Sequence, residues 1–183
     1  MLTGAAAIYA AAVTKRPEAN IVLTGFMGTG KTTVGRILAD SLGFDFVDTD
    51  ELIEADNGPI PLIFAEQGED TFRSIEHAVA VDLAERHRTV IATGGRLMLD
   101  PRNALALGET GRVFCLAAPA ATILERVLGD GATRPLLDSD DPAARITELL
   151  AERAEGYHQF EQIETAGLTP EQIADEITDR ILA

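Results

Sequence analysis

The segment GFMGTGKT at residues 25–32 has the residue types and spacing of a loop that holds phosphate groups. It follows the apolar run at 21–23 and precedes a stretch with helical periodicity. Glycines let the backbone turn so that its N–H groups converge on a phosphate chain, and the helix that follows adds the positive end of its dipole. Lys31 supplies a point charge, and Thr32 supplies a hydroxyl group that can bind Mg²⁺. The pattern therefore predicts that the chain binds ATP or GTP.

Two carboxylates, Asp48 and Asp50, follow a predicted strand at residues 44–47, with Thr49 between them. In an extended segment, alternate side chains point to the same face. One carboxylate would then hold Mg²⁺ while the other meets the hydroxyl group of an acceptor. A solvated turn is the alternative structure for two acids after a strand. The phosphate-binding loop favours the functional interpretation, because a magnesium nucleotide needs a nearby acid.

Three arginines could contact anionic ligands. Arg73 lies near the start of a predicted helix, where a cation opposes the helix dipole, and Glu76 follows on the same face. The alternative for this pair is an exposed ion pair of little energetic value. Arg134 lies in a segment rich in glycine, proline and aspartate at residues 129–141, which is suited to closing over phosphates. Arg153 lies in a helix of mixed charge, where an exposed surface position is the alternative.

Short apolar strands alternate with amphipathic helices, which is the pattern of a parallel sheet covered by helices. Strands are predicted at residues 21–24, 44–47, 90–92, 113–116 and 162–165, and helices at 51–55, 61–68, 71–85, 119–128 and 142–160. Three more helices are predicted: one that ends at Gly43, a short one with Asp100 as its N-cap and Pro101 as its first residue, and one that begins after Thr169. Ligands of such sheets bind beyond the carboxyl ends of the strands. Gly94 and Gly95 follow the third strand there, and would serve either a close approach to a ligand or a plain tight turn.

The chain has 183 residues and a net charge of −15, with 46% hydrophobic residues. This length predicts one domain at residues 20–183, preceded by a loosely ordered extension at 1–19. The acidic charge argues against nucleic acid and anionic membranes as partners, and no apolar run is long enough to span a membrane. The lone Cys115 indicates a buried thiol in a reducing cytoplasm. We expect a cytoplasmic protein that acts as a monomer.

The motifs taken together resemble the shikimate kinase family, which has a P-loop fold of the nucleoside-monophosphate-kinase type. The resemblance covers residues 20–183, and it is carried by GFMGTGKTTVG at 25–35, FVDTD at 46–50, FAEQGEDTFRSIE at 64–76, Gly94-Gly95, TRPLL at 133–137, and Glu152-Arg153 ahead of Tyr157. It implies a three-layer α/β fold in which a five-stranded parallel sheet is flanked by helices, with a mobile lid at about 129–141.

The same resemblance implies a function. The chain would use ATP, with Mg²⁺ as cofactor, to phosphorylate the 3-hydroxyl group of shikimate, a step toward chorismate and aromatic amino acids. The residues implied for the catalytic step are Lys31, Asp50 and Arg134; for ATP, Gly28, Thr29, Gly30, Lys31, Thr32, Thr33, Arg126 and Arg134; for magnesium, Thr32 and Asp48; and for shikimate, Asp50, Arg73, Gly94, Gly95 and Arg153. Arg73 and Arg153 would clamp the carboxylate, since a planar guanidinium bonds both of its oxygens.

One position departs from the family pattern, which has three glycines after the third strand where this chain has Gly94, Gly95 and Arg96. Arg96 could leave the backbone amide available, alter which acid is preferred, or replace part of the carboxylate clamp. Two alternatives to shikimate phosphorylation therefore stay open. One is a related kinase that acts on another hydroxy acid such as gluconate, and the other is a nucleotide-binding regulator with weak catalysis.

Overall fold

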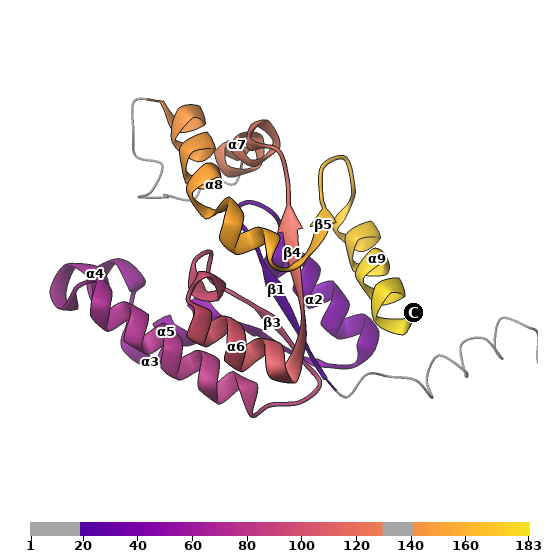
Figure 1. The fold of residues 1–183 in the computed structure, drawn as a ribbon, viewed down its shortest axis with the longest axis horizontal. Helices are drawn as coiled ribbons and strands as arrows, with labels where there is room; N and C mark the ends of the chain where they lie inside the picture. The colour runs from indigo at the N-terminus through magenta and orange to yellow at the C-terminus, as the bar shows by residue number, and fades with distance from the viewer. Residues whose placement is uncertain (1–18, 130–140) are drawn as a thin grey trace, which may run out of the picture.

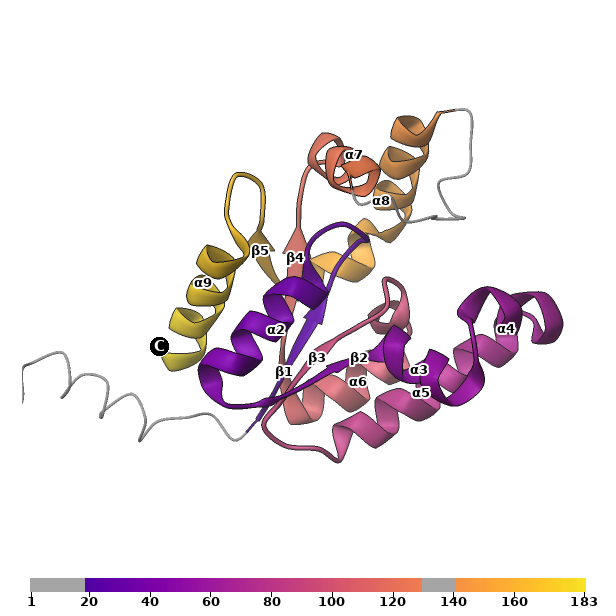
Figure 2. The ribbon, with the colours of Figure 1, turned by 180° about the vertical axis from the view of Figure 1, so that it is seen from behind.

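The computed structural model describes residues 19–129 and 141–183. Its strands form a parallel sheet of five, in the order β2-β3-β1-β4-β5 (Figures 1 and 2). The strands are β1 (Asn20–Thr24), β2 (Asp45–Asp48), β3 (Thr89–Ala92), β4 (Gly111–Ala117) and β5 (Glu161–Glu164). All neighbouring strands pair in parallel, so their carboxyl ends lie at the same edge. The predicted α/β fold with a five-stranded parallel sheet is confirmed.

Helices join successive strands and cover both faces of the sheet. They are α2 (Lys31–Leu42), α3 (Thr49–Asn57), α4 (Ile60–Gln67), α5 (Glu69–Ala84), the short 3₁₀ helix η1 (Leu97–Leu99), α6 (Pro101–Thr110), α7 (Ala120–Gly129), α8 (Pro142–His158) and α9 (Pro170–Leu182). The two opposite views show α2 and α9 on one face of the sheet and α5 and α6 on the other (Figures 1 and 2).

Side-chain alternation in β1 explains how both faces are covered. Ile21 and Leu23 belong to a buried cluster with residues of α2 and α9, whereas Val22 belongs to another with residues of α5 and α6. Successive side chains of a strand point to opposite faces, and a parallel sheet buried on both faces therefore has a continuous apolar strand. All five residues of β1 are buried. This central strand leads directly into the phosphate-binding loop.

Side-chain caps begin several helices where the sequence predicts them. Asp100 accepts a hydrogen bond from the backbone N–H of Arg102, just before Pro101 opens α6. Thr169 forms a reciprocal capping box with Gln172 at the start of α9. Such caps satisfy the N–H groups that the first turn of a helix leaves without partners. Local sequence signals therefore determine these two boundaries.

Several boundaries differ by one or more residues from the sequence-based prediction. Strand β2 covers residues 45–48 and strand β5 covers 161–164, each displaced by one residue from the predicted range. Helix α3 begins at Thr49, directly after β2, because the Asp48 side chain caps it by accepting a hydrogen bond from the N–H of Asp50. The prediction that Asp48 and Asp50 share an extended segment is therefore wrong, since only Asp48 lies on the strand.

Two predicted features lie almost wholly outside the described residues. The N-terminal extension at 1–19 has only its last residue described, and the lid at 129–141 has only its first and last. Arg134 also falls outside the described residues. Within the part of the chain that the structure describes, no helix is both long enough and apolar enough to cross a membrane.

Candidate active site

The phosphate-binding loop connects β1 to α2 in the predicted strand–loop–helix order. Gly28 and Gly30 have φ angles of 74° and 95°, in the left-handed region that glycine adopts without steric cost. The buried Thr29 donates a hydrogen bond from its hydroxyl group to the carbonyl oxygen of Phe26 at 2.8 Å, which holds the loop closed on itself. Since Gly30 is the N-cap of α2, the N–H groups at the start of this helix face the loop and favour an anion.

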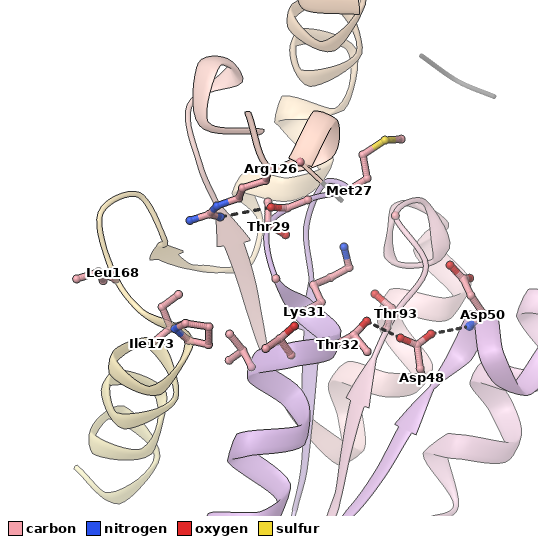
Figure 3. A pocket seen from close by; sticks show the side chains of 17 residues that line it. Met27, Thr29, Lys31, Thr32, Asp48, Asp50, Thr93, Arg126, Leu168 and Ile173 are labelled. Atoms are coloured by element: carbon pink, nitrogen blue, oxygen red, sulfur yellow. Dashed lines mark hydrogen bonds between the residues drawn. The ribbon is translucent and has the colours of Figure 1, made fainter. Parts of the chain in front are cut away.

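A cavity of about 760 Å³ opens over this loop. It is lined by Met27, Gly28, Thr29, Gly30, Lys31, Thr32, Thr33, Val34, Asp48, Asp50, Thr93, Gly95, Arg126, Gly129, Leu168, Pro170 and Ile173 (Figure 3). The predicted nucleotide residues of the loop, both aspartates, Gly95 and Arg126 thus face one space. They meet because the loop, Asp48 and Thr93 all lie at the carboxyl ends of neighbouring strands.

Lys31 and Thr32 open α2 and face the cavity. The Nζ atom of Lys31 donates hydrogen bonds to the carbonyl oxygens of Gly25 at 3.0 Å and Phe26 at 2.9 Å. The hydroxyl group of Thr32 donates to Oδ2 of Asp48 at 2.7 Å (Figure 3). Register explains this contact, because Asp48 ends β2 two strands away from β1 in the sheet. A cation and a pair of adjacent oxygen donors are therefore placed together at the loop.

Asp50 lies in the first turn of α3, with its carboxylate at the rim of the cavity. Burial raises its pKa from 3.8 to about 6, and the neighbouring negative charge of Asp48 adds to this, while the positive charges of Lys31 and Arg73 oppose it. Both cations therefore lie within electrostatic reach of this carboxylate. A carboxylate with a pKa near 6 is better matched than an ordinary aspartate to accept a proton near neutral pH.

Arg73, on α5, lies between two carboxylates of its own helix. Its Nη1 atom donates to Oε2 of Glu76 at 2.6 Å, and its Nη2 and Nε atoms donate to Oε1 of Glu69 at 2.9 and 3.2 Å. Glu76 is buried, and burial raises its pKa although Arg73 opposes the shift. The predicted pairing of Arg73 with Glu76 is confirmed, and Glu69 is a partner that the sequence analysis missed.

Arg153, on α8, is buried with 8% of its surface exposed, so the alternative of an exposed surface position is wrong. Its guanidinium lies over the ring of Phe26 in the phosphate-binding loop, 5.2 Å from the ring centre. A Cβ atom at Gly95 would lie 3.8 Å from its Nη1 atom. The structure therefore brings Arg153 from a distant part of the sequence to the loop and to Gly95. Helical periodicity on its own does not indicate these partners.

The turn after β3 is held by side chains from two other elements. The N–H of Gly94 donates to the hydroxyl oxygen of Thr49 at 2.8 Å, and the carbonyl oxygen of Gly95 accepts a hydrogen bond from Tyr157. A Cβ atom at Gly94 would collide with Oδ1 of Asp50 and lie 3.3 Å from its Cγ. Gly94 therefore allows the close approach of Asp50, and its own N–H is engaged within the chain. The contacts of Thr49 and Tyr157 with this turn could not be predicted from the residue pattern, because both join segments far apart in the chain.

Arg126, on α7, faces the far end of the cavity. It donates hydrogen bonds to the carbonyl oxygen of Gly28 at 3.3 Å, to the hydroxyl oxygen of Thr165 at 2.9 Å, and to the carbonyl oxygen of Thr165 at 2.7 Å. These bonds tie the phosphate-binding loop to the segment between β5 and α9. Leu168 of that segment lines the same end of the cavity (Figure 3). Pro170, the first residue of α9, also lines the cavity. A flat guanidinium and apolar side chains there suit a planar ring.

The fold and the cavity together define a P-loop kinase, a class in which the protein positions phosphates and an acceptor at the carboxyl edge of a parallel sheet. A family model described as Shikimate kinase matches residues 27–182. The chain is 48% identical over 160 residues to a shikimate kinase of Thermodesulfovibrio yellowstonii, covering 86% of this chain and 92% of that relative. It is 43% identical over 169 residues to one of Halorhodospira halophila, covering 91% and 95%. The chain belongs to the shikimate kinase family.

Solved structures agree with this assignment. A shikimate kinase from Acinetobacter baumannii in complex with shikimate matches with a TM-score of 0.85 and 37% identity, covering 93% of this chain and 97% of the other. A gluconokinase from Sinorhizobium meliloti matches with a TM-score of 0.63 at 19% identity, covering 92% and 95%. The second match, at 19% identity, shows only that the fold is shared with another small-molecule kinase.

Proposed function

We propose that this chain transfers the γ-phosphoryl group of ATP to the 3-hydroxyl group of shikimate, giving ADP and shikimate 3-phosphate, in the pathway to chorismate and aromatic amino acids. The observation that carries the proposal is that the phosphate-binding loop and Asp50 line one cavity. Arg73, within electrostatic reach of Asp50, and Arg153, which packs against that loop, add positive charge beside it. Two anionic ligands can therefore be held side by side. We expect the reaction to take place in the cytoplasm, with the enzyme acting as a monomer.

The nucleotide would bind along the cavity. Its phosphates would lie on the loop from Gly28 to Thr33, where the N–H groups and the dipole of α2 favour negative charge. Lys31 would exchange its bonds to loop carbonyls for the transferring phosphate oxygens. The adenine ring would lie beside Arg126, near Leu168 and Pro170. Arg134 is proposed to add positive charge from the lid.

The residues at the loop fit Mg²⁺. Oγ1 of Thr32 and Oδ2 of Asp48 lie 2.7 Å apart, and both are hard oxygen donors of the kind that this ion prefers. Among the described residues no group of three or more His, Cys, Asp or Glu side chains could hold a metal. Phosphates and waters would supply the other ligands of Mg²⁺. When bound, Mg²⁺ neutralises charge on the phosphate oxygens.

The acceptor would bind at the other side of Asp50. Arg73 and Arg153 would hold the shikimate carboxylate, and Gly95 allows the ligand to approach the backbone between Arg153 and the loop. The two guanidinium groups are already oriented by Glu76 and by the ring of Phe26. Because these side chains are already ordered, less conformational entropy is lost when the substrate binds. Gly94 supports the acceptor site indirectly, because it leaves room for the Asp50 carboxylate.

In the transfer step, the 3-hydroxyl oxygen attacks the γ-phosphorus atom while the bond to the β,γ-bridging oxygen breaks and ADP leaves. Asp50 accepts the hydroxyl proton, for which a pKa of about 6 is suitable. Lys31 and Arg134 stabilise the charge spread over the phosphoryl oxygens. Catalysis in this class consists mainly of such positioning and charge stabilisation.

A turnover assay with several acceptors tests the proposal. The purified protein is incubated with Mg-ATP and either shikimate or gluconate, and ADP release and the ³¹P spectrum of the product are measured. We expect one phosphate monoester of shikimate for each ADP, and no ester of gluconate. Turnover of gluconate without shikimate would instead favour a related kinase whose acceptor site is changed at Arg96. Nucleotide binding without transfer to either acid would favour a regulatory protein.

A further inference from the structure

Arg96 joins the ion-pair network at the acceptor side. Its Nη1 atom lies 3.2 Å from Oε1 of Glu69, the same oxygen that accepts hydrogen bonds from Arg73 at 2.9 and 3.2 Å. Glu69 begins α5, and Arg96 is the N-cap of η1, so the contact links the start of α5 to the turn after β3. One carboxylate oxygen is therefore shared by two arginines, only one of which belongs to the proposed carboxylate clamp.

Glu69 occupies one edge of the Arg73 guanidinium, formed by Nε and Nη2. Bidentate binding of a carboxylate uses two parallel N–H groups of this kind. A substrate carboxylate that binds this edge must therefore displace Glu69. The other partner, Glu76, has 3% of its side chain exposed, whereas Glu69 has 53% exposed. Leaving a buried carboxylate without its partner is costly, so the substrate carboxylate is expected to displace Glu69 from Arg73 and to leave Glu76 in place.

We propose that Arg96 is a positioning residue for the acceptor: it retains Glu69 when the substrate carboxylate takes the Nε–Nη2 edge of Arg73. This inference rests on the proposed function, since it assigns the clamp to a carboxylate acceptor. Arg96 acts through Glu69, drawing its negative charge away from the incoming carboxylate. It thereby lowers the free energy needed to open Arg73 to the substrate.

The geometry suits such an exchange. Arg96 has 51% of its side chain exposed, so it can follow Glu69 without repacking a core. Its backbone is fixed, since its carbonyl oxygen accepts a hydrogen bond from the N–H of Leu99 at 2.9 Å. Exposed ion pairs shift an equilibrium constant by up to about fivefold. The contribution of Arg96 to acceptor binding is therefore expected to be of this size.

A double-mutant cycle on the full chain tests the inference, with steady-state kinetics at saturating Mg-ATP. We expect Arg96→Ala to raise the KM for shikimate about three- to fivefold with little change in kcat or in the KM for ATP, and Arg96→Lys to restore most of the loss. Glu69→Gln removes the competing charge and should lower the KM. In the Glu69→Gln background, Arg96→Ala should change the KM by less than about 1.5-fold.

A matched control is the exposed ion pair between Arg36 and Glu51, whose side chains are 53% and 63% exposed and which joins α2 to α3. Arg36→Ala should leave the KM for shikimate unchanged, and thermal unfolding checks that each variant is folded. An equal rise in KM on Arg96→Ala in both backgrounds would mean that Arg96 binds the acceptor directly, and would overturn this inference alone. Failure of the unsubstituted chain to phosphorylate shikimate would overturn the proposed function and this inference together.

Discussion

Lys31 carries the positive charge of the phosphate-binding loop, and its Nζ atom donates hydrogen bonds to the carbonyl oxygens of Gly25 and Phe26. We predict that Lys31→Ala lowers kcat about 10²- to 10³-fold, because it removes a preorganised charge at the transferring phosphate. The free energy of unfolding should change little, since the ammonium group is replaced at a solvent-facing rim. Initial rates and thermal unfolding measure both effects. Arg36→Ala, on the same helix, is the control, and near-normal turnover of Lys31→Ala would remove the lysine from the mechanism.

Asp50 sets the expected pH dependence of the reaction. Burial and the charge of Asp48 raise its pKa to about 6, and the carboxylate must be deprotonated to accept the hydroxyl proton. We therefore predict that kcat/KM for shikimate rises with pH and levels off above an apparent pKa of about 6. The residual activity of Asp50→Asn should lack this inflection. A profile that is flat between pH 5 and 7.5 would contradict the role of Asp50 as a base.

The same pKa shift predicts a change in stability. A folded-state pKa raised from 3.8 to about 6 means that this group stabilises the fold below about pH 4 and loses that contribution as the pH rises through 6. Asp50→Asn stays neutral, so at pH 7.5 the variant should be more stable than the unsubstituted chain by up to about 3 kcal/mol, and the difference should shrink at pH 5. Urea unfolding at the two pH values measures it. If Asp50→Asn were less stable than the unsubstituted chain at pH 7.5, burial of the charged carboxylate could not be the cause of the raised pKa.

At the scale of elements, the parts that local signals specify could be predicted from the sequence. The loop between β1 and α2 follows from its glycines and Lys31, and the start of α9 follows from the pairing of Thr169 with Gln172. In each case the residues that determine the structure are neighbours in the chain. The alternating apolar segments likewise predict the parallel sheet, because their lengths and spacing leave few other arrangements.

The parts that depend on distant partners could not be predicted from residue patterns, although the family resemblance implies a substrate-binding role for Arg153. Arg153 looks like a surface residue of α8, and it is buried only because Phe26 and Gly95 lie against it. The sequence suggests that Asp48 shares an extended segment with Asp50, whereas Asp48 is the last residue of β2 and its side chain caps α3. A residue of this type favours both a strand end and an N-cap, and tertiary packing decides between them.

The turn after β3 gives a prediction about close packing between elements. A Cβ atom at Gly94 would collide with Oδ1 of Asp50, so Gly94→Ala must displace the proposed base. We expect turnover of shikimate to fall at least tenfold while the affinity for ATP stays near normal, because the phosphate-binding loop is not touched. Gly108→Ala is the matched control, since a Cβ atom there would meet nothing within 4 Å and alanine favours the helix α6. Equal activity of the two variants would show that the Asp50 carboxylate can move away from a Cβ atom at position 94 without loss of catalysis.

For the whole molecule, the charge distribution sets the main constraint on ligand binding. The net charge is −15 and the sequence has two lysines, Lys15 and Lys31. Both proposed substrates are anions, so the cations that hold them must be gathered at one rim against an unfavourable overall field. Arg73, Arg126 and Arg153 come from three different helices to that end of the molecule. The fold therefore concentrates positive charge where the composition provides little of it.

Binding at this rim should stabilise the whole fold. A ligand present at 100 times its dissociation constant raises the free energy of unfolding by about 2.7 kcal/mol if it binds only the native state. For a chain of this length we predict that Mg-ATP raises the melting temperature by about 5–10 °C. The increase should be much smaller for Lys31→Ala, whose loop has lost its charge. A melting temperature that does not respond to Mg-ATP would contradict nucleotide binding in the cavity.

The central claim is that nucleotide and acceptor meet between Lys31 and Asp50. A crystal structure of the complex with ADP and shikimate tests it most directly. We predict that the diphosphate lies on the loop at 25–32, that the shikimate carboxylate lies between Arg73 and Arg153, and that the 3-hydroxyl group lies within hydrogen-bond distance of Asp50. Shikimate bound away from Asp50, or held by neither arginine, would contradict the account.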